Sequence, residues 1–389
     1  MRRDLRARAR RADARDPAAR GAPRSTPPCR GPRDRSLRDP GPAVRRHPRR
    51  SAVSGARLSP WAAYRLRLKR RRLLWRAFRA RHALTPVTDR TAAISPGAIL
   101  VVAVIRNEAQ RLPYFLDHYR RLGVGHFLIV DNASDDAGPE ILTGAPDVSL
   151  WHTQAGYKAA RFGLDWANWL LRRHGTGHWC VTVDADELLV YPDHDTLSLP
   201  DLSGRLASGG RAAMGALMLD LYPRGPLGAQ PYAAGEDPTR LLRHFDAGPY
   251  RAVRQSPMEN LWVQGGVRER MFFADMPRRS PTLNKLPFVH WRRGYVYVNS
   301  THAMLPRRLN RLYDGPGGAQ PSGVLLHTKF LPSILSRSAE EKRRRQHFGD
   351  PEAFDGYYDG LIAGPVLWSD TSATYDGAKG LEALGLMRR

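Results

Sequence analysis

Cysteine is nearly absent from this chain: only Cys29 and Cys180 occur among 389 residues. Cys29 lies in a stretch rich in proline and arginine, and Cys180 lies in an apolar run, so the sequence can build neither a disulfide framework nor a cysteine zinc site. No stretch approaches about 18 uninterrupted apolar residues, so we expect no membrane-spanning helix. The basic N-terminus is followed by no apolar run, which excludes the pattern of a secretory signal. Together these absences predict a cytoplasmic protein.

Acidic residues are scarce in the first 90 residues, which hold 28 lysines and arginines but only 6 aspartates and glutamates. The other 299 residues hold 34 basic and 31 acidic residues, so the formal charge of +25 belongs almost entirely to the N-terminal segment. A nearly neutral body excludes a protein that binds nucleic acid over its whole surface. We therefore expect no nucleic-acid partner.

Large apolar residues are also rare in residues 1–52, which consist mainly of arginine, proline, alanine and aspartate. Such a segment cannot bury enough surface to offset the entropy lost on ordering. The composition predicts a disordered Arg/Pro-rich segment. The alternative is an over-long reading frame that begins upstream of the true start.

Residues 53–92 have the pattern of a basic amphipathic helix and a linker. Ser59 and Pro60 stand in the order expected for an N-cap and a first helical residue, and Thr85-Pro86 ends the helix. Two interpretations stay open for residues 59–81. The helix either makes a peripheral contact with an anionic membrane at the inner face of the plasma membrane, or packs on the body with its arginines in water. Nucleic-acid binding ranks third because no reader motif accompanies the charge.

From residue 93 the pattern changes to alternating strands and helices. Three apolar runs have the length of buried strands: Ile99–Ile105, His126–Val130 and Trp179–Val183. Helical spacing separates them, over Leu112–Leu122 and over a long helix at Tyr157–Arg173. This alternation predicts the α/β class, with a Rossmann-type parallel sheet covered by helices on both faces. We assign this pattern to residues 93–204.

The rest of the chain is less regular. Residues 205–335 contain short apolar strands such as Ala216–Leu221 and Val324–His327, joined by loops rich in glycine and proline. Residues 336–389 predict a charged helix at Ser338–His347 followed by a weakly patterned tail. The sequence therefore predicts a second, less regular half and a C-terminal helix.

Polar residues follow each of the three predicted strands. They are Arg106-Asn107-Glu108, Asp131-Asn132 and Asp184-Ala185-Asp186. Each group alone is explained as a turn or a helix cap. Because the carboxyl ends of parallel strands meet at one edge of a sheet, three such groups in chain order indicate a ligand site there.

The pair Asp184 and Asp186 has the chemistry of a divalent-cation site. Two carboxylates that leave one strand end two residues apart are expected to point to the same side. They can hold Mn²⁺ or Mg²⁺ while leaving positions for phosphate oxygens. Such an ion neutralises the charge that develops on a diphosphate leaving group. The alternative is that Asp186 and Glu187 only cap the next element.

These residues together resemble a known family. Strand–RNE–helix, strand–DNxSxD and helix–strand–DxDE, over roughly residues 97–200, look like the nucleotide-sugar-binding half of a glycosyltransferase family 2 enzyme with the GT-A fold. The segment Arg106–Asp135 is similar to a bacterial branch that also resembles the family 92 type. The resemblance implies transfer of a sugar from a nucleotide donor, most often a UDP-hexose, with Mn²⁺ or Mg²⁺. It also implies that residues 205–335 bind the acceptor.

The resemblance gives each matched residue an expected role. Glu108 and Asp131 would contact the nucleoside, Asp184 would lie near the ribose or diphosphate, and Asp186 would ligate the metal. Arg161 would reach the diphosphate, although an exposed helical arginine is an equal alternative. The remaining candidates for nucleotide binding at these strand ends are Arg106, Asn107, Asn132 and Ser134.

The C-terminal half adds further candidates. His327 follows an apolar run, where a late histidine of GT-A enzymes completes the metal site, and Lys329 would add a cation for the phosphates. The alternative for His327 is an ordinary polar residue beside a strand. An inverting transfer also needs a carboxylate that deprotonates the acceptor, and Asp220 and Glu269 are the candidates. The acidic pair typical of family 2 is absent, so inversion or retention stays open.

We therefore predict a glycosyltransferase that moves a hexose from a nucleotide-sugar, a UDP-sugar in the first instance, to a glycan or lipid-linked acceptor. A metal-dependent phosphoryl-transfer enzyme is one alternative, but it needs a nucleophilic aspartate where Arg106 and Asn107 stand. A basic adaptor that binds membrane or nucleic acid through residues 1–90 is another. It would not need polar residues at three strand ends.

Overall fold

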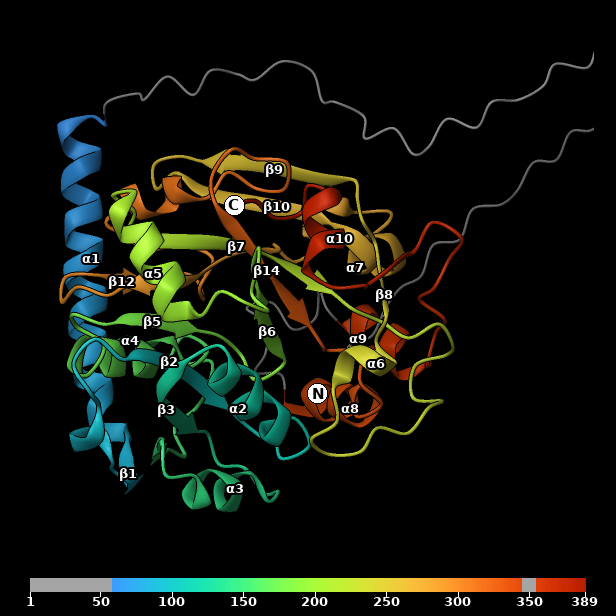
Figure 1. The fold of residues 1–389 in the computed structure, drawn as a ribbon, viewed down its shortest axis with the longest axis horizontal. Helices are drawn as coiled ribbons and strands as arrows, with labels where there is room; N and C mark the ends of the chain where they lie inside the picture. Colours follow the sequence, from blue (N-terminus) through green and yellow to red (C-terminus); the bar gives the residue numbers. More distant parts are fainter. Residues whose placement is uncertain (1–57, 345–354) are drawn as a thin grey trace, which may run out of the picture. The chain divides into compact units, whose positions relative to one another are not determined.

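The computed structural model describes residues 58–344 and 355–389 (Figure 1), which all fall within the unit Arg57–Arg389. The predicted disorder of residues 1–52 lies outside the described residues. The helices are α1 (Pro60–Ala80), α2 (Leu112–Arg121), α3 (Gly138–Gly144), α4 (Leu164–Arg173), α5 (Leu199–Ser208), α6 (Pro238–Leu241), α7 (Gly266–Phe272), α8 (Ile334–Arg344), α9 (Asp355–Ile362) and α10 (Ala378–Ala383). Short 3₁₀ turns are η1 (Arg81–Ala83), η2 (Thr91–Ala93), η3 (Pro277–Arg279) and η4 (Arg307–Leu312).

The strands form one large sheet and three small ones. They are β1 (Thr85–Thr88), β2 (Ile99–Ile105), β3 (Val124–Asp131), β4 (Val148–His152), β5 (Trp179–Thr182), β6 (Glu187–Val190), β7 (Ala213–Asp220), β8 (His244–Phe245), β9 (Tyr250–Gln255), β10 (Asn260–Gly265), β11 (Asn284–His290), β12 (Val296–Tyr297), β13 (Met304–Leu305), β14 (Ser322–His327) and β15 (Ala373–Thr374). The large sheet has nine strands in the order β1-β4-β3-β2-β5-β11-β7-β14-β6.

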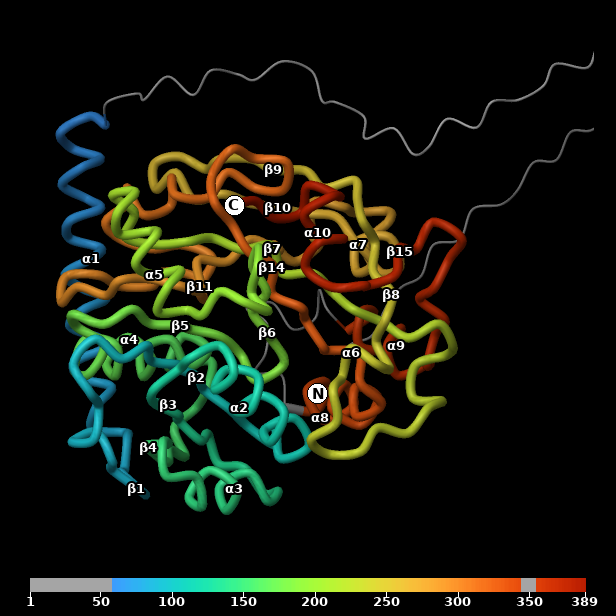
Figure 2. Tube along the Cα trace, in the orientation of Figure 1, coloured from blue at the N-terminus to red at the C-terminus, as the bar shows by residue number. Residues whose placement is uncertain are grey.

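The large sheet is parallel in its first half and mixed in its second. Strands β4, β3, β2 and β5 run parallel, as do β7 and β14. Strand β11 runs antiparallel between β5 and β7, and β1 and β6 are antiparallel edge strands. The predicted α/β class and the Rossmann-type parallel strands are confirmed. The large sheet is not parallel throughout, because β11 enters it antiparallel from the second half of the chain (Figure 2).

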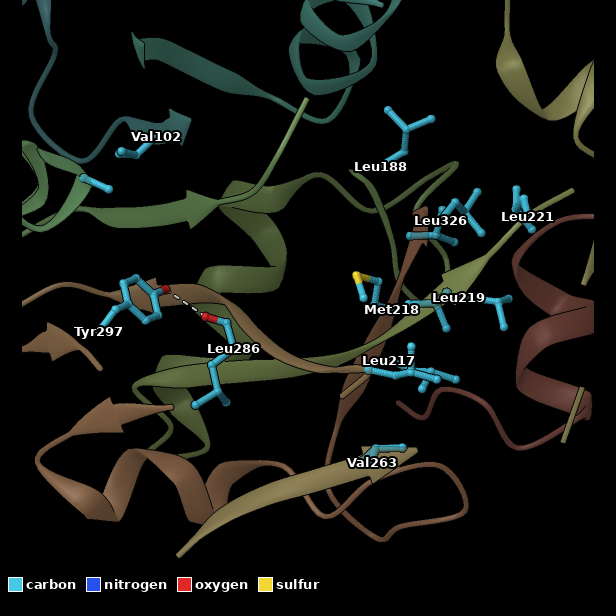
Figure 3. Packing of buried hydrophobic residues seen from close by; sticks show 14 of the residues in the cluster. Val102, Leu188, Leu217, Met218, Leu219, Leu221, Val263, Leu286, Tyr297 and Leu326 are labelled. Atoms are coloured by element: carbon cyan, nitrogen blue, oxygen red, sulfur yellow. Dashed lines mark hydrogen bonds between the residues drawn. The ribbon is translucent and has the colours of Figure 1, made fainter. Parts of the chain in front are cut away.

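Both faces of the sheet are covered, which explains the continuous apolar runs of the central strands. On one face Leu100 and Val102 of β2 belong to a core cluster with Trp166 and Leu170 of α4. On the other face Val101 of β2 and its neighbours cluster with residues of α2 and α5. The first cluster continues into the second half of the chain, where Figure 3 shows Leu217 and Leu219 of β7 close to Val263 of β10.

Helix α1 begins where the sequence predicts. The Ser59 hydroxyl accepts a hydrogen bond from the Ala62 amide at 3.2 Å, and Pro60 is the first helical residue. Leu73 and Ala77 are buried, and Arg76 pairs with Asp165 of α4 at 2.9 Å. One side of α1 is therefore packed on the body. No helix in the described part of the chain is long and apolar enough to cross a membrane.

Two predicted helices have different limits in the structure. The helix expected at Tyr157–Arg173 begins only at Leu164, because Arg161, Phe162 and Gly163 have φ values of 56°, 60° and 74°, in the left-handed region that a helix excludes. Arg161 thus lies in a turn before α4. Helix α8 begins at Ile334, ahead of the predicted Ser338, and runs to Arg344; the rest of that predicted helix lies outside the described residues.

The fit between β7 and the η4 region predicts the effect of a single methyl group. A Cβ on Gly215 would lie 2.2 Å from Cβ of Tyr313, whereas a Cβ on Gly204 of α5 would meet nothing within 4 Å. We expect Gly215→Ala to lower the free energy of unfolding by about 1–3 kcal/mol through overpacking. Gly204→Ala is the control and should raise it by up to about 1 kcal/mol. Urea unfolding measures both, and equal midpoints for Gly215→Ala and wild type would contradict the packing argument.

Candidate functional site

Six strands end at one edge of the large sheet. Strands β2, β3, β4, β5, β7 and β14 all point the same way, since β11 is antiparallel to both β5 and β7. The register places Asp220 of β7 beside His327 of β14, and His327 beside Glu187 of the antiparallel β6. Backbone pairing alone therefore places one acidic residue on each side of His327, Asp220 on β7 and Glu187 on β6.

Side chains at this edge form a row in which acidic and basic groups alternate. His327 Nε2 lies 3.2 Å from Asp186 Oδ2, and His327 Nδ1 lies 2.5 Å from Asp220 Oδ1. Arg268 of α7 donates through Nε to the other oxygen of Asp220 at 2.7 Å. All four residues are buried or nearly so. The predicted residues Asp186, Asp220 and His327 are thus brought together, and Arg268 joins them.

Each charged group in this row stabilises the charged form of its neighbour. Burial would lower the pKa of His327, but the carboxylates of Asp186 and Asp220 outweigh it and raise that pKa to about 9. Burial would likewise raise the pKa of Asp186, yet His327 holds it well below its usual value. Asp220 also has a lowered pKa, because Arg268 and His327 overcome the effect of burial. Both carboxyls are therefore ionised at neutral pH.

Asp184 faces a different partner from Asp186. Its side chain is 53% exposed, and its Oδ2 lies 3.2 Å from Nζ of Lys285 on β11. The same ammonium lies 2.8 Å from Glu187 Oε1, and both Lys285 and Glu187 are buried. Asp184 and Asp186 therefore have different partners, Lys285 on β11 and His327 on β14, and their joint binding of one cation stays a prediction.

Sequence reasoning missed Lys285. Lys285 stands in the otherwise apolar strand Asn284–His290, where a buried ammonium must have an acidic partner. That isolated charge was a signal which could have been used.

The ends of β2 and β3 bind each other closely. Arg106 donates to the Asn132 and Ala133 carbonyls at 2.9 and 2.5 Å, and the Asn107 amide donates to Ser134 Oγ at 2.9 Å. Asn132 donates through its side-chain amide to the backbone carbonyls of Thr153 and Ala155. These predicted nucleotide-binding side chains therefore shape the two loops and lie at the same edge.

Two acidic candidates, Asp131 at the end of β3 and Glu108 after β2, have basic partners. Asp131 is buried, accepts from the Ser134 amide at 3.2 Å and lies 2.9 Å from His152 Nδ1. Glu108 pairs with Arg111 at 2.9 Å and with Arg337 of α8 at 2.5 Å. Helix α8 therefore reaches the end of β2, a contact between segments far apart in the sequence.

Arg161 and Lys329 differ in how they are held. Arg161 pairs with Asp165 at 2.9 Å and donates to the Val298 carbonyl at 2.6 Å, so its guanidinium is tied to α4 and β12 and not directed at Asp186. Lys329 makes no hydrogen bond or ion pair with any residue in the described ranges. Its pKa is lowered by burial even though Asp186 is near. It is a cation beside Asp186 with its donors unused.

The two candidate bases, Asp220 and Glu269, already form ion pairs with arginines. Asp220 accepts from Arg268 and His327, as described above. Glu269 accepts from Arg251 at 2.6 Å through each oxygen and from Ser280 at 2.8 Å. Neither carboxylate has the freedom that a general base needs while these ion pairs stand.

A small hollow adjoins this edge. It is lined by residues from the ends of β2 and β5, the turn before α4 and the loop after β12: Val102, Ala103, Val104, Phe162, Gly163, Leu164, Ala167, Thr182, Val183, Asp184, Lys285, Ser300 and Thr301. Its open space measures about 350 Å³ and includes a part open to solvent. Asp184 and Lys285 both line this hollow, and Lys285 also pairs with the buried Glu187.

The donor set fits a divalent cation through two protein ligands. In residues 58–344 and 355–389 no group of three or more histidine, cysteine, aspartate or glutamate residues could hold a metal. Asp186 Oδ2 and His327 Nε2 form an ion pair at 3.2 Å, close enough for both to bind one ion once the imidazolium loses its Nε2 proton, and Asp220 accepts from Nδ1, which is the outer partner that a metal-binding imidazole takes. Mg²⁺ and Mn²⁺ commonly take their remaining ligands from water and substrate phosphates.

Comparisons with known proteins give no family. No protein-family model matches the chain, and no curated protein matches its sequence. A solved 4-diphosphocytidyl-2C-methyl-D-erythritol synthase is 16% identical, with 36% of this chain and 68% of that one covered, at a TM-score of 0.22. A protein described as a glucose-1-phosphate thymidylyltransferase from Bacillus anthracis is 10% identical, with 75% and 96% covered, at a TM-score of 0.26. With TM-scores this low, neither likeness bears on function, and the resemblance to glycosyltransferase families 2 and 92 stays a prediction.

The ion pair between Lys285 and Glu187 predicts a pH-dependent loss of stability. Burial raises the pKa of Glu187 from 4.5 to about 7, although Lys285 opposes this. Replacing Lys285 by methionine leaves the Glu187 carboxylate buried without a cation and should cost about 3–5 kcal/mol of unfolding free energy above pH 7. A group whose folded pKa is raised stabilises the fold below its unfolded pKa and loses that effect as pH rises, so the cost should shrink toward pH 4.5.

The control for Lys285→Met is the double variant Lys285→Met/Glu187→Gln. It removes both buried charges and should recover most of the lost stability at neutral pH. Urea unfolding at several pH values measures all three proteins. A loss for Lys285→Met that stays constant across the pH range would show that missing packing, and not the unpaired carboxylate, causes it.

Proposed function

We propose that this protein is a glycosyltransferase that moves a hexose from a nucleotide-sugar, in the first instance a UDP-sugar, to a hydroxyl group of a glycan or lipid-linked acceptor. The observation that carries the proposal is the arrangement of Asp186, His327 and Asp220 at the carboxyl edge of the sheet. In open α/β sheets, ligands bind at this edge. The GT-A resemblance of residues 97–200 suggests the reaction, and the charged residues at this edge support it.

In this proposal Asp186 and His327 would hold Mn²⁺ or Mg²⁺, and the imidazolium of His327 would release its Nε2 proton to water as the ion binds. The bound ion would neutralise the charge that develops on the diphosphate as it leaves. Asp220 holds a proton on His327 Nδ1 and so keeps Nε2 directed at Asp186, which makes Asp220 a positioning residue. Arg268 fixes Asp220 in turn. Lys329, which has no hydrogen-bond partner among the described residues, would meet a phosphate oxygen beside Asp186.

Asp184 and the β2 and β3 ends form the nucleoside side of the proposed site. Asp184 is half exposed and stands in the wall of the hollow next to Phe162, so its free oxygen can accept from a ribose hydroxyl. Arg106, Asn107, Asn132 and Ser134 keep the loops around it in shape. Glu108 and Asp131 lie at the ends of β2 and β3 outside the lining of this hollow, with Arg337 and His152 as their partners.

The proposed transfer breaks one bond to the sugar and forms another. The bond between the sugar anomeric carbon and the diphosphate oxygen breaks, a bond from that carbon to the acceptor oxygen forms, the acceptor proton is released and the nucleoside diphosphate departs. Asp220 and Glu269 are both held by arginines, so the proposal gives neither the role of base. The acceptor would lie toward the second half of the chain, which supplies His327, Lys329 and Arg268.

Calorimetric titration of UDP tests the donor site. We expect wild-type protein to bind UDP with Mn²⁺ and to lose binding in EDTA. Asp186→Asn should weaken metal-dependent binding by about tenfold or more, because an amide is a poorer ligand than a carboxylate. The matched control is Asp195→Asn, which changes an exposed carboxyl in the loop after β6 and should bind as wild type does.

The outcomes separate the parts of the proposal. Equal binding in EDTA would remove the metal from it, and equal binding by Asp186→Asn would move the site elsewhere. No binding of UDP, GDP or CDP in any condition would reject a nucleotide-sugar transferase. Thermal unfolding of each variant shows that a lost signal does not come from lost structure.

A further inference from the structure

Helix α1 has two faces of opposite kind. Toward the body it buries Leu73 and Ala77, and Leu73 forms a small core cluster with Val296 of β12 and Leu305 of β13. Its other face carries four large apolar side chains that touch water: Trp61 is 66% exposed, Tyr64 48%, Leu68 45% and Trp75 59%. Figure 1 shows α1 running along one side of the described unit, beside α4 and β12.

The four exposed apolar residues share one stripe of the helix. Spacings of three, four and seven residues from Trp61 through Tyr64 and Leu68 to Trp75 return to the same side of an α-helix. At a rise of about 1.5 Å per residue the stripe extends for about 20 Å. It lies on the side opposite Leu73 and Ala77, so the packing of α1 on the body does not use it.

Arginines border this stripe without acidic neighbours. Arg65, Arg71, Arg72 and Arg79 are exposed, and the helical spacing places them among the aromatic rings. None of the four forms an ion pair in the described residues, and no aspartate or glutamate occurs between residues 40 and 88. We call the four apolar residues and these four arginines the outer face of α1.

We propose that the outer face of α1 docks on an anionic phospholipid membrane, with the helix lying in the plane of the interface. Aromatic and leucine side chains enter the boundary between headgroups and acyl chains, where tryptophan is favoured, while arginines beside them pair with lipid phosphates. Each arginine near such a surface adds attraction to anionic lipid. The binding does not depend on the reaction at the sheet edge, so it can hold or fail independently of the proposed function.

Other occupants fit this face less well. A second copy would bring its own arginines against these, and like charges in contact are unfavourable. Single-stranded nucleic acid binds in basic grooves that follow its backbone, with aromatic rings stacking on bases. Here the rings and Leu68 lie along one straight helix on the outside of the unit. A flat anionic and apolar surface is complementary to that shape.

Vesicle binding of the full-length chain tests the proposal. We expect the protein to sediment with vesicles of phosphatidylcholine and phosphatidylglycerol in equal parts and to stay in solution with phosphatidylcholine alone. Trp61→Ser/Trp75→Ser should lower the partition coefficient by about tenfold or more, because the apolar anchors are lost. Arg71→Gln/Arg72→Gln should lower it by about 30-fold, the equivalent of two surface arginines.

Matched controls change similar residues elsewhere on the surface. Val253→Ser/Met276→Ser removes two exposed apolar side chains, and Arg205→Gln/Arg240→Gln removes two exposed charges. Both should bind vesicles as wild type does. Unchanged unfolding temperatures for all four variants would confirm that the substitutions act on the surface alone.

Three results would overturn the proposal. Wild-type binding by Trp61→Ser/Trp75→Ser would show that the vesicles attract other basic residues of the chain. Equal binding to neutral and anionic vesicles would remove the role of the arginines. Intact vesicle binding by both α1 variants together with weakened binding of single-stranded RNA would assign the face to nucleic acid. UDP binding measured on the same variants should be unchanged, which keeps this test separate from that of the donor site.

Discussion

Buried carboxylates at one edge of the sheet need positive charges, and most of those charges come from the second half of the chain. Glu187 pairs with Lys285, Asp186 with His327 and Glu108 with Arg337. A buried charge without a partner costs several kcal/mol, so these pairs hold the two halves in one arrangement. The segments that follow β2 and β5 supply the acids, and β11, β14 and α8 supply the cations.

The same charge balance determines the chemistry that the edge can support. Lys285 pairs with Asp184 and Glu187, and Arg268 pairs with Asp220. Asp186 and His327 pair with each other, and the nearby Lys329 has no ion pair within residues 58–344 and 355–389. An anionic substrate such as a nucleoside diphosphate would meet a site whose own carboxylates are already neutralised. For the proposed transfer, this arrangement would suit stabilisation of a leaving diphosphate better than proton abstraction by Asp220 or Glu269, whose oxygens already accept from arginines.

Helix α1 shows how one sequence pattern can satisfy two environments. The sequence left open whether its apolar residues pack on the body or meet a lipid surface. The structure shows that Leu73 and Ala77 pack inward, while Trp61 and Trp75 remain in water. The two interpretations therefore concern different faces of one helix and do not exclude each other.

Local patterns in the sequence were sufficient for the α/β class and for the limits of β2, because continuous apolar runs between helical segments have few other solutions. They also located the polar strand ends, since loss of hydrophobicity after a buried strand is visible in one sequence. They could not show that Arg161 sits in a left-handed turn, that β11 inserts antiparallel between β5 and β7, or that Asp184 and Asp186 take different partners. Those features depend on contacts between residues a hundred or more positions apart, such as Asp184 with Lys285, and only the tertiary structure brings such residues together.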